Sequence, residues 1–243
     1  RLLYRASLND GLQDEPFIDK ELVEYTTFGN DWVTYITESG KEGLVQAWFT
    51  RGDETILLNE IKTDETYFVE LAKLGDTPIM AVGSPAENRA IVYQDPQRYL
   101  AENPDVRIPV ATTVLRVNAP QDVIISSDSS VILAYGPKNM ASHEFDADRS
   151  YNFKLSLDLD ERQEPRWLDG QHISVSSGGV QYMIDFDGSN VNELVASLPR
   201  LGSFYSDDVE TMFTFTDAVV NDAGEIETPA RMLSTSLLAP EDQ

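Results

Sequence analysis

The sequence contains no cysteine. Disulfide bonds, thiolate metal sites and cysteine nucleophiles are therefore excluded. Histidine is scarce as well, because only His143 and His172 occur in 243 residues. The two lie in different predicted strands, and no Gly-x-Ser-x-Gly elbow accompanies them, so nothing in the sequence indicates a Ser-His-Asp site. We therefore expect no catalytic residues.

Long apolar runs and basic residues are also in short supply. No apolar run approaches the ~18 residues that a membrane-spanning helix needs. Lysine and arginine total 18 against 42 acidic residues, which gives a formal net charge of −24. Such a chain repels phosphate backbones and anionic lipid surfaces. Nucleic acid is therefore not an expected partner, and neither is direct membrane insertion by this segment. A highly soluble surface, a cationic partner or bound cations fit the charge.

The overall composition nevertheless predicts a folded protein. Hydrophobic residues make up 41% and charged residues 25% of the chain, which is close to the globular average. The chain opens at Arg1, with neither a methionine nor a signal-peptide pattern. We therefore expect a processed product or an excised piece of a longer protein.

The chain is rich in short segments of Val, Ile, Thr, Tyr and Phe, separated by turn-prone residues, which predicts strands. An acidic residue recurs in the turn before the second strand of each unit. The separations between these residues are 45, 52, 41 and 39, and the residues are Asp31, Asp76, Asp128, Asp169 and Asp208. A β-propeller blade has roughly 40–45 residues. The sequence therefore predicts repeated four-stranded blades.

The one long separation has a local explanation. Residues 95–102 have the pattern of a short inserted helix, with Asp95 as N-cap and Pro96 at the first helical position. Asn103-Pro104 is expected to end it. Without these residues the separation returns towards the period of the other units.

The predicted fold is all-β, a propeller of four-stranded antiparallel blades, with about five visible and room for a larger propeller. We expect residues 1–243 to form a single propeller domain or a propeller fragment. Its blade-like units are 22–62, 66–117, 121–157, 164–198 and 201–238. A β-sandwich is the alternative fold, since short strands and regular turns fit both, but the period favours the propeller.

The two ends of the chain leave two possibilities open. The last unit shows only three strands, near 202–206, 210–216 and 231–238. Residues 1–8, from Leu2 to Leu8, form an orphan strand. This strand either completes the last blade and closes the ring, or is what remains of an earlier blade.

Apolar residues on the predicted strands give the expected core between blades. Trp32, Trp48 and Trp167 lie within apolar strand patterns, so we expect them to pack in the core rather than stack on sugars. The core residues predicted in this way are Val33, Tyr35, Leu44, Trp48, Ile79, Ile91, Ile124, Leu133, Trp167, Val175, Ile184 and Phe213.

Two acidic clusters raise the question of a metal. Asp185, Asp187, Ser189 and Asn190 offer the oxygen ligands that calcium prefers. However, Ala196 stands where an EF-hand requires glutamate, and a hairpin turn with Asx-type hydrogen bonds explains the same residues. The same holds for the second cluster, Asp158, Asp160 and Glu161. We expect no metal site and no cofactor, and calcium is the one cation that the sequence leaves open.

A phosphate-binding loop is not expected either. Ser177-Gly178-Gly179 is followed by a strand rather than by the helix that nucleotide loops require. We therefore expect it to form a hairpin turn.

Several segments together resemble a known group of proteins. The turn Asp185-Phe-Asp-Gly-Ser-Asn190, followed by Leu194-Val195, resembles TolB-type and WD-like propeller repeats. A closer resemblance, best from residue 66 onwards, is to the C-terminal propeller of PEGA-domain proteins from candidate-phyla bacteria. It is carried, in order along the chain, by Val92-Tyr-Gln-Asp-Pro96, Trp167-Leu-Asp-Gly170, Phe186-Asp-Gly-Ser-Asn190 and the ending Leu233-Ser-Thr-Ser-Leu-Leu-Ala-Pro-Glu-Asp-Gln243.

This resemblance implies a location but no chemistry. Members of the group look like surface proteins with an N-terminal membrane anchor, a PEGA domain and an outward-facing propeller. It therefore implies an extracytoplasmic, cell-surface domain, anchored through a segment that this chain does not contain. It brings no catalytic residue with it.

Three functions remain open at this point. The favoured one is a non-catalytic surface-binding or scaffold domain that recognises an envelope protein or a glycan through its propeller loops. The alternative is a propeller glycoside hydrolase that uses channel carboxylates, which would need raised pKa values on two carboxylates facing the channel. The third is a structural spacer, which would carry no distinctive pocket.

Overall fold

In the computed structural model, the described residues are 2–4, 6–7, 11–12, 16–63, 65–160, 164–198, 203–206, 210–220 and 226–237, and most of them form β-strands. Four antiparallel four-stranded sheets follow one another along the chain, each with its strands in sequence order. The first two sheets are β3 (Leu22–Phe28), β4 (Trp32–Glu38), β5 (Leu44–Arg51) and β6 (Glu54–Lys62), then β7 (Phe68–Leu74), β8 (Thr77–Ser84), β9 (Arg89–Gln94) and β10 (Thr113–Arg116).

The next two sheets repeat this arrangement. They are β11 (Asp122–Ile125), β12 (Val131–Tyr135), β13 (Asn139–Glu144) and β14 (Arg149–Lys154), then β15 (Arg166–Trp167), β16 (His172–Ser177), β17 (Val180–Asp185) and β18 (Asn192–Ala196). A fifth sheet has three strands, β19 (Phe204–Tyr205), β20 (Thr211–Thr216) and β23 (Arg231–Ser236). Two small pairs complete the strands, β1 (Ala6–Ser7) with β2 (Gly11–Leu12) and β21 (Val219–Val220) with β22 (Ile226–Thr228).

The repeated acidic turn is confirmed for four sheets. Asp31, Asp76, Asp128 and Asp169 each lie in the turn or bend before the second strand of a sheet. Asp208 lies outside the described residues. The three strands expected of the last unit are present as β19, β20 and β23.

The inserted helix is also confirmed. α1 (Pro96–Glu102) begins after Asp95, whose side chain accepts a hydrogen bond from the Arg98 N–H, and Asn103 is its C-cap. It lies between the third and fourth strands of the second sheet. A short 3₁₀ helix, η1 (Pro85–Glu87), that the sequence did not predict joins β8 to β9.

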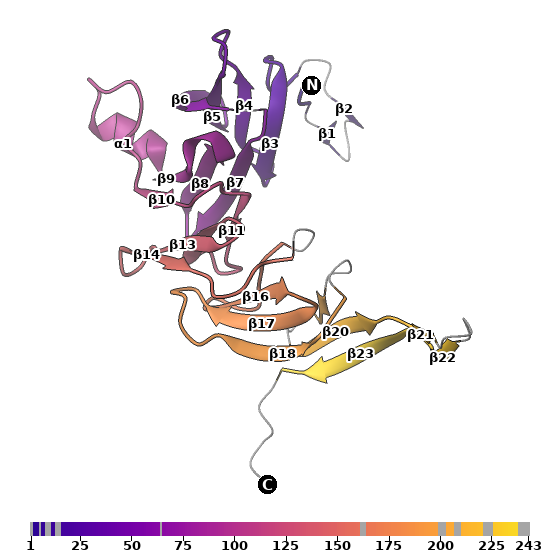
Figure 1. The fold of residues 1–243 in the computed structure, drawn as a ribbon. Helices are drawn as coiled ribbons and strands as arrows, with labels where there is room; N and C mark the ends of the chain where they lie inside the picture. Colours follow the sequence, from indigo (N-terminus) through magenta and orange to yellow (C-terminus); the bar gives the residue numbers. More distant parts are fainter. Residues whose placement is uncertain are drawn as a thin grey trace.

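The sheets stack face to face along an arc (Figure 1). β7 lies against β3 and β4 on one side and against β11 on the other, and β11 lies against β15. The first strands of successive sheets therefore converge on one side, as the innermost strands of propeller blades do. The fold is thus of the β-propeller type. In Figure 1 the sheet β3–β6 lies at one end of the arc and the strands β20 and β23 lie at the other.

The hydrophobic core lies between neighbouring sheets. Because successive side chains of a strand point to opposite faces, one strand contributes residues to the core layers on both sides of its sheet. Met80 and Val82 of β8 pack towards the first sheet, whereas Ile79 and Ala81 pack towards the third. All four are fully buried. A strand such as β8 that is buried on both faces has a continuous apolar sequence. β12 is likewise buried at every position.

The predicted core is mostly confirmed. Seven of the twelve residues are buried, namely Val33, Tyr35, Ile79, Ile91, Leu133, Val175 and Ile184. Leu44, Trp48, Ile124, Trp167 and Phe213 are half-buried instead. Ile124 and Trp167 line a cavity, and Phe213 lies on a sheet that has a neighbouring sheet on one face only within the described part of the chain.

The N-terminal segment does not complete the fifth sheet. Leu3 forms a β-bridge with Ile18, and its carbonyl accepts a 2.7 Å hydrogen bond from the Phe17 N–H. Leu3, Phe17 and Ile18 pack with Leu22 and Tyr35 on the outer face of the first sheet. Leu3, Phe17 and Ile18 therefore cover the first sheet, and the residues described between 2 and 20 contribute no strand to the fifth.

Candidate functional site

The inner side of the arc carries a cavity of about 490 Å³. Its walls come from the first strands of four successive sheets. Phe28 stands at the end of β3, Glu70 on β7, Ile124 on β11, and Arg166 and Trp167 on β15. The volume lies in the range of small-molecule sites, but the cavity is shallow and opens broadly to solvent.

Four carboxylates lie along this inner wall, one from each of the same sheets. Glu24 lies on β3, Glu70 on β7 and Asp122 on β11, and Glu164 comes two residues before β15. The negative charge of Asp122 acts on Glu70, and the charges of Glu164 and Glu24 act on Asp122. The wall therefore concentrates negative charge across the sheet boundaries.

Burial in this wall changes the protonation of two carboxylates. Desolvation raises the pKa of Glu70 to about 7, and the charge of Asp122 adds to the rise. Desolvation also raises the pKa of Asp122, although the Val123 N–H opposes the rise by donating a 2.7 Å hydrogen bond to Oδ1. Near neutral pH, Glu70 can donate a proton or carry a charge, which is how acid–base groups are prepared.

Aromatic side chains lie next to these carboxylates. Phe28 is 41% exposed, and its ring lies 5.7 Å from that of Trp32. Trp167 is half-buried, and its Nε1 is a buried donor without a hydrogen-bond partner in the described part of the chain. An aromatic surface beside hydrogen-bonding groups is suited to a ligand that has both an apolar face and polar edges.

The sequence analysis did not single out the four carboxylates of the inner wall. The chain has 42 acidic residues, so single carboxylates carry no signal. The period would have identified them, because Glu24, Glu70, Asp122 and Glu164 are separated by 46, 52 and 42 residues. These separations follow those of the acidic turns, 45, 52 and 41. A second acidic position thus recurs in each of the four units.

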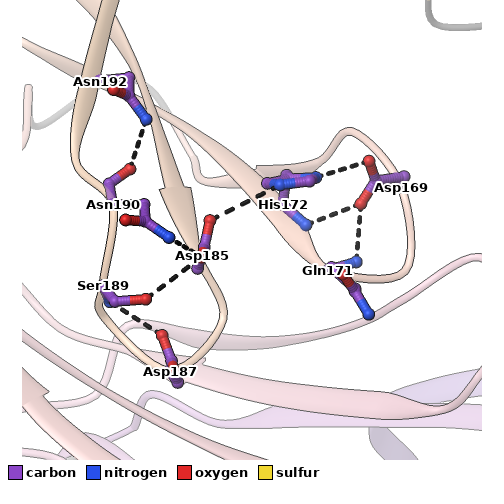
Figure 2. A network of polar contacts seen from close by, with 8 residues as sticks. All are labelled: Asp169, Gln171, His172, Asp185, Asp187, Ser189, Asn190 and Asn192. Carbon is purple, nitrogen blue, oxygen red and sulfur yellow. Dashed lines mark hydrogen bonds and ion pairs between the residues drawn. The ribbon is translucent and has the colours of Figure 1, made fainter.

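His172 belongs to a polar network of turns in the fourth sheet (Figure 2). Its Nδ1 lies 2.7 Å from Asp169 Oδ2, and its backbone N–H donates to Asp169 Oδ1 at 2.7 Å. Its Nε2 lies 3.6 Å from Asp185 Oδ1. The imidazole therefore joins the turn before β16 to the end of β17.

Asp169 holds its charge in this network. Desolvation opposes ionisation, but the hydrogen bonds from His172 and from the Gln171 N–H outweigh it, so the pKa of Asp169 lies below its usual range. This arrangement explains why an acidic residue suits the turn before the second strand.

The other histidine is a packing residue. His143 is 3% exposed, its Nδ1 lies 3.0 Å from Ser150 Oγ, and its ring meets Phe145 edge to face. Burial lowers its pKa. The structure does not bring His143 and His172 together, since they belong to β13 and β16 of different sheets.

The residues considered for calcium form a hydrogen-bonded turn (Figure 2). Asp185 Oδ2 accepts from Asn190 Nδ2 at 2.6 Å and from Ser189 Oγ at 3.2 Å. Asp187 Oδ1 accepts from the Ser189 N–H at 2.9 Å, which is an Asx-type turn. No group of three or more metal-ligating side chains with a suitable arrangement occurs among the described residues.

The second acidic cluster is likewise engaged in structure. The Asp160 carboxylate accepts hydrogen bonds from Ser176 Oγ at 2.6 Å and from the Gly178 N–H at 3.0 Å. It therefore stabilises the hairpin turn predicted at residues 177–179. Asp158 pairs with Lys138 at 2.8 Å. Glu161 lies outside the described residues.

Comparison with known proteins identifies the fold and no family. No protein-family model matches the chain, and no curated protein matches it. Among solved structures, Kluyveromyces lactis Hsv2 with its loop 6CD replaced by a Gly-Ser linker has a TM-score of 0.51 at 10% identity, over 94% of this chain and 76% of that one. Hsv2 with the complete loop 6CD has the same TM-score and identity, over 95% and 78%.

A third similar structure is a putative 6-phosphogluconolactonase from Bacteroides uniformis, with a TM-score of 0.48 and 11% identity over 93% of this chain and 75% of that one. At such identities the similarity concerns the fold alone. The chain has a propeller-type fold, and its function has to be argued from its own site.

Proposed function

We propose that the protein is a non-catalytic binding domain of the cell envelope, and that its recognition surface is the inner wall of the arc. The observation that carries the proposal is the 490 Å³ cavity between the first strands of four sheets, with Glu70, Arg166 and Trp167 in its lining. A structural spacer is expected to carry no such cavity, lined by a desolvated carboxylate and aromatic side chains.

The lining favours a glycan over a protein as the ligand. Phe28 and Trp167 offer aromatic surface, while Glu70, Glu164 and Arg166 offer charged hydrogen-bonding groups. Sugar rings present an apolar face and hydroxyl edges, so they can use both. The volume suits one or two sugar units. A ligand with an amino group would also gain from the negative charge of the wall.

The envelope location is part of the proposal. It is supported by the resemblance of segments such as Trp167–Gly170 and Phe186–Asn190 to propellers of PEGA-domain surface proteins. In the described part of the chain, no helix is long and apolar enough to cross a membrane. Membrane attachment through a segment outside residues 1–243 is part of the same proposal.

A glycan array, with an envelope-extract pull-down in parallel, tests the function. We expect the wild-type protein to bind a subset of glycans, and Arg166→Ala to lose most of that binding. Arg149→Ala is the matched control, because Arg149 is an exposed arginine on the outer strand β14. Capture of a protein instead of a glycan, sensitive to Arg166→Ala, would identify a protein ligand at the same wall. Silence in both assays, or equal effects of the two variants, would contradict the proposal.

A second candidate function, glycoside hydrolysis, is favoured by one observation. Two inner-wall carboxylates, Glu70 and Asp122, have raised pKa values, and that of Glu70 is about 7. A glycosidase needs one carboxyl that is protonated near neutral pH as general acid and another that acts as nucleophile or base. Glu70 fits the first role, and Asp122 or Glu164 fits the second.

A panel of chromogenic glycosides separates hydrolysis from binding. A hydrolase would turn over at least one substrate, with a falling limb of the pH profile near pH 7 that disappears with Glu70→Gln. Glu193→Gln, on the exposed strand β18, is the matched control. Binding on the array without turnover of the corresponding glycosides would exclude this second function.

A further inference from the structure

The first strands of three sheets each direct a carboxylate towards the next sheet along the arc. Glu24, Glu70 and Asp122 pair across their sheets with core residues that pack in the layer shared with the following sheet. These pairs are Glu24 with Ile36, Glu70 with Ala81 and Asp122 with Tyr135. Because paired residues share a face of the sheet, the inner wall carries one carboxylate at each of three successive junctions.

In the described part of the chain, neither these carboxylates nor Glu164 beside them form an ion pair. Ion pairs with lysine or arginine occur elsewhere, at Glu60, Asp76, Glu87, Glu102 and Asp158. The charge of Asp122 instead acts on Glu70, and those of Glu24 and Glu164 act on Asp122. Such repulsion is unfavourable between carboxylates that are partly removed from water, and a bound cation relieves it.

Arg166 belongs to the cavity lining but is directed away from these junctions. It pairs with Ser174, whose hydroxyl is hydrogen-bonded by Tyr205 of the fifth sheet. The charge of Arg166 acts on the same tyrosine. Arg166 therefore lies towards the fifth sheet and leaves the carboxylates of the other junctions without a counter-charge.

A buried hydroxyl in the cavity lining is also without a partner. Ser129 is 7% exposed and lines the cavity, and its hydroxyl makes no hydrogen bond to any residue that the structure describes. By contrast, the hydroxyls of Ser126 and Ser130 both donate to Asp128 Oδ1, at 2.7 and 2.8 Å. A buried polar group without a hydrogen bond costs free energy, which a polar group of a ligand in the cavity recovers.

We infer that the inner wall binds a glycan whose sugar units carry positively charged amino groups, an inference that rests on the binding function proposed above. The ammonium groups lie against Glu70 and the carboxylates beside it, and a sugar hydroxyl completes the hydrogen bonding of Ser129. The sugar rings face Phe28 and Trp167, where an ammonium group over an aromatic ring also gains a cation–π contact. Because the carboxylates belong to different sheets, a disaccharide with two amino groups uses more of them than a single amine does.

Two disaccharides of glucosamine that differ only at the nitrogen test the inference. One is N-acetylated and neutral, and the other is N-trimethylated and keeps its positive charge at every pH. The measurement is made at about pH 8, where Glu70 is ionised. We expect the cationic disaccharide to bind at one site, at least about tenfold more tightly than the neutral one. Isothermal titration calorimetry measures both affinities, and added salt should weaken the binding of the cationic disaccharide alone.

Two double variants separate the wall from the overall charge of the protein. Glu70→Gln with Asp122→Asn removes two carboxylates of the wall, and Glu193→Gln with Asp105→Asn removes two exposed carboxylates elsewhere. We expect the wall variant to lose at least about tenfold in affinity for the cationic disaccharide and the control variant less than about twofold. Equal losses would mean that the ligand responds only to the net charge of −24 and would overturn the inference.

A measurement on the wild-type chain keeps the inference testable if the wall variant unfolds. The chain has three tryptophans, and the variant Trp167→Phe assigns the Trp167 indole N–H signal in NMR spectra. We expect the cationic disaccharide to shift this signal until the site is saturated. The signal of Trp48, which packs on the outer face of the first sheet, should stay in place. An unshifted Trp167 signal would overturn the inference.

The remaining outcomes separate the inference from the proposed function. Equal binding of the two disaccharides would overturn the inference and leave the proposed binding function intact. The same holds if neither disaccharide binds while the glycan array records another ligand whose binding requires Arg166. Silence of the array together with both disaccharides would overturn the inference and the glycan-binding function alike.

Discussion

The two ends of the arc differ in what covers them. At one end, the first sheet is packed on both faces, by the second sheet and by the chain's own residues near Ile18. At the other end, the fifth sheet meets another sheet on one face only within the described part of the chain. We call its opposite face, which carries the exposed Phe204 and Met232, the end face. The same repeat is thus covered on both faces at one end of the arc and, among the described residues, on one face at the other.

The comparison shows where stability comes from in this fold. Each layer between sheets buries side chains from two units, so a sheet gains most of its hydrophobic stabilisation from the units beside it. Among the described residues, the middle sheets have two such neighbours and the fifth has one. Changes in the middle of the arc should therefore cost much more than equivalent changes on the end face.

The largest effect is expected from methionine truncation in the two regions. Met140 is fully buried between the third and fourth sheets, whereas Met232 is 62% exposed on the end face. We expect Met140→Ala to lower the free energy of unfolding by about 2–4 kcal/mol and Met232→Ala by less than about 0.5 kcal/mol. Urea unfolding of both variants at low salt measures the difference. Similar losses of unfolding free energy in the two variants would contradict the predicted difference between the middle of the arc and the end face.

Two glycine substitutions sharpen the comparison between packed and open positions, the first of them at the junction of the third and fourth sheets. Gly188 has φ of +86°, and a Cβ there would lie 2.4 Å from Phe153 Cγ, whereas Gly178 has φ of +57° and open space around it. We expect Gly188→Ala to cost about 2–4 kcal/mol, from strain and overpacking together, and Gly178→Ala about 1 kcal/mol, from strain alone. Thermal unfolding checks both values. A Gly188→Ala variant no less stable than Gly178→Ala would mean that the sheets are packed more loosely than described.

Because the inner wall holds a desolvated carboxylate, we expect the stability of the protein to depend on pH. The strand residues of the end face include no carboxylate. The folded pKa of Glu70, about 7, lies above its ordinary value of 4.5, so the folded state binds more protons than the unfolded state between these pH values. Stability is therefore expected to fall as pH rises from about 4.5 to 7. After discounting for solvent screening, we expect a loss of about 1–2 kcal/mol.

The variant Glu70→Gln should remove this pH dependence and unfold at higher urea than the wild type at pH 8. Glu193→Gln, on an exposed strand, should leave it unchanged. Parallel pH profiles for the wild type and Glu70→Gln would contradict the assignment of Glu70 to a desolvated site.

The smallest effect concerns the segment that covers the first sheet. Lys20 Nζ lies 3.2 Å from the centre of the Trp48 ring, and desolvation lowers the pKa of this lysine. We expect Lys20→Gln to cost about 0.5–1 kcal/mol through loss of the cation–π contact. Hydrogen exchange of Leu22–Phe28 should rise modestly in this variant while β20 is unaffected. An unchanged exchange rate in β3 would mean that the contact does not hold the cover in place.

Much of the fold could be predicted from the sequence because the repeat is local. The acidic turns at Asp31, Asp76, Asp128 and Asp169, the helix after Asp95 and the hairpin at residues 177–179 each depend on a few neighbouring residues. Turn chemistry and capping are encoded at that range. The strand patterns then follow from burial on one or two faces.

The candidate site could not be predicted, because it depends on which strands face the inside of the arc. Glu70 and Asp122 look like any other acidic residue until β7 and β11 are placed side by side. Phe213 was expected in the core, since its strand pattern is that of a buried sheet, but it lies half-buried on the end face. Strand patterns record that a face can be covered and say nothing about whether a neighbour is present.

Small-angle X-ray scattering of the dilute protein at low salt tests the central claim most directly. The account predicts the profile of an open arc, with the first and fifth sheets at separate ends and the end face free. The profile of a compact closed disc would contradict it, because the two ends would then cover each other and no end face would exist.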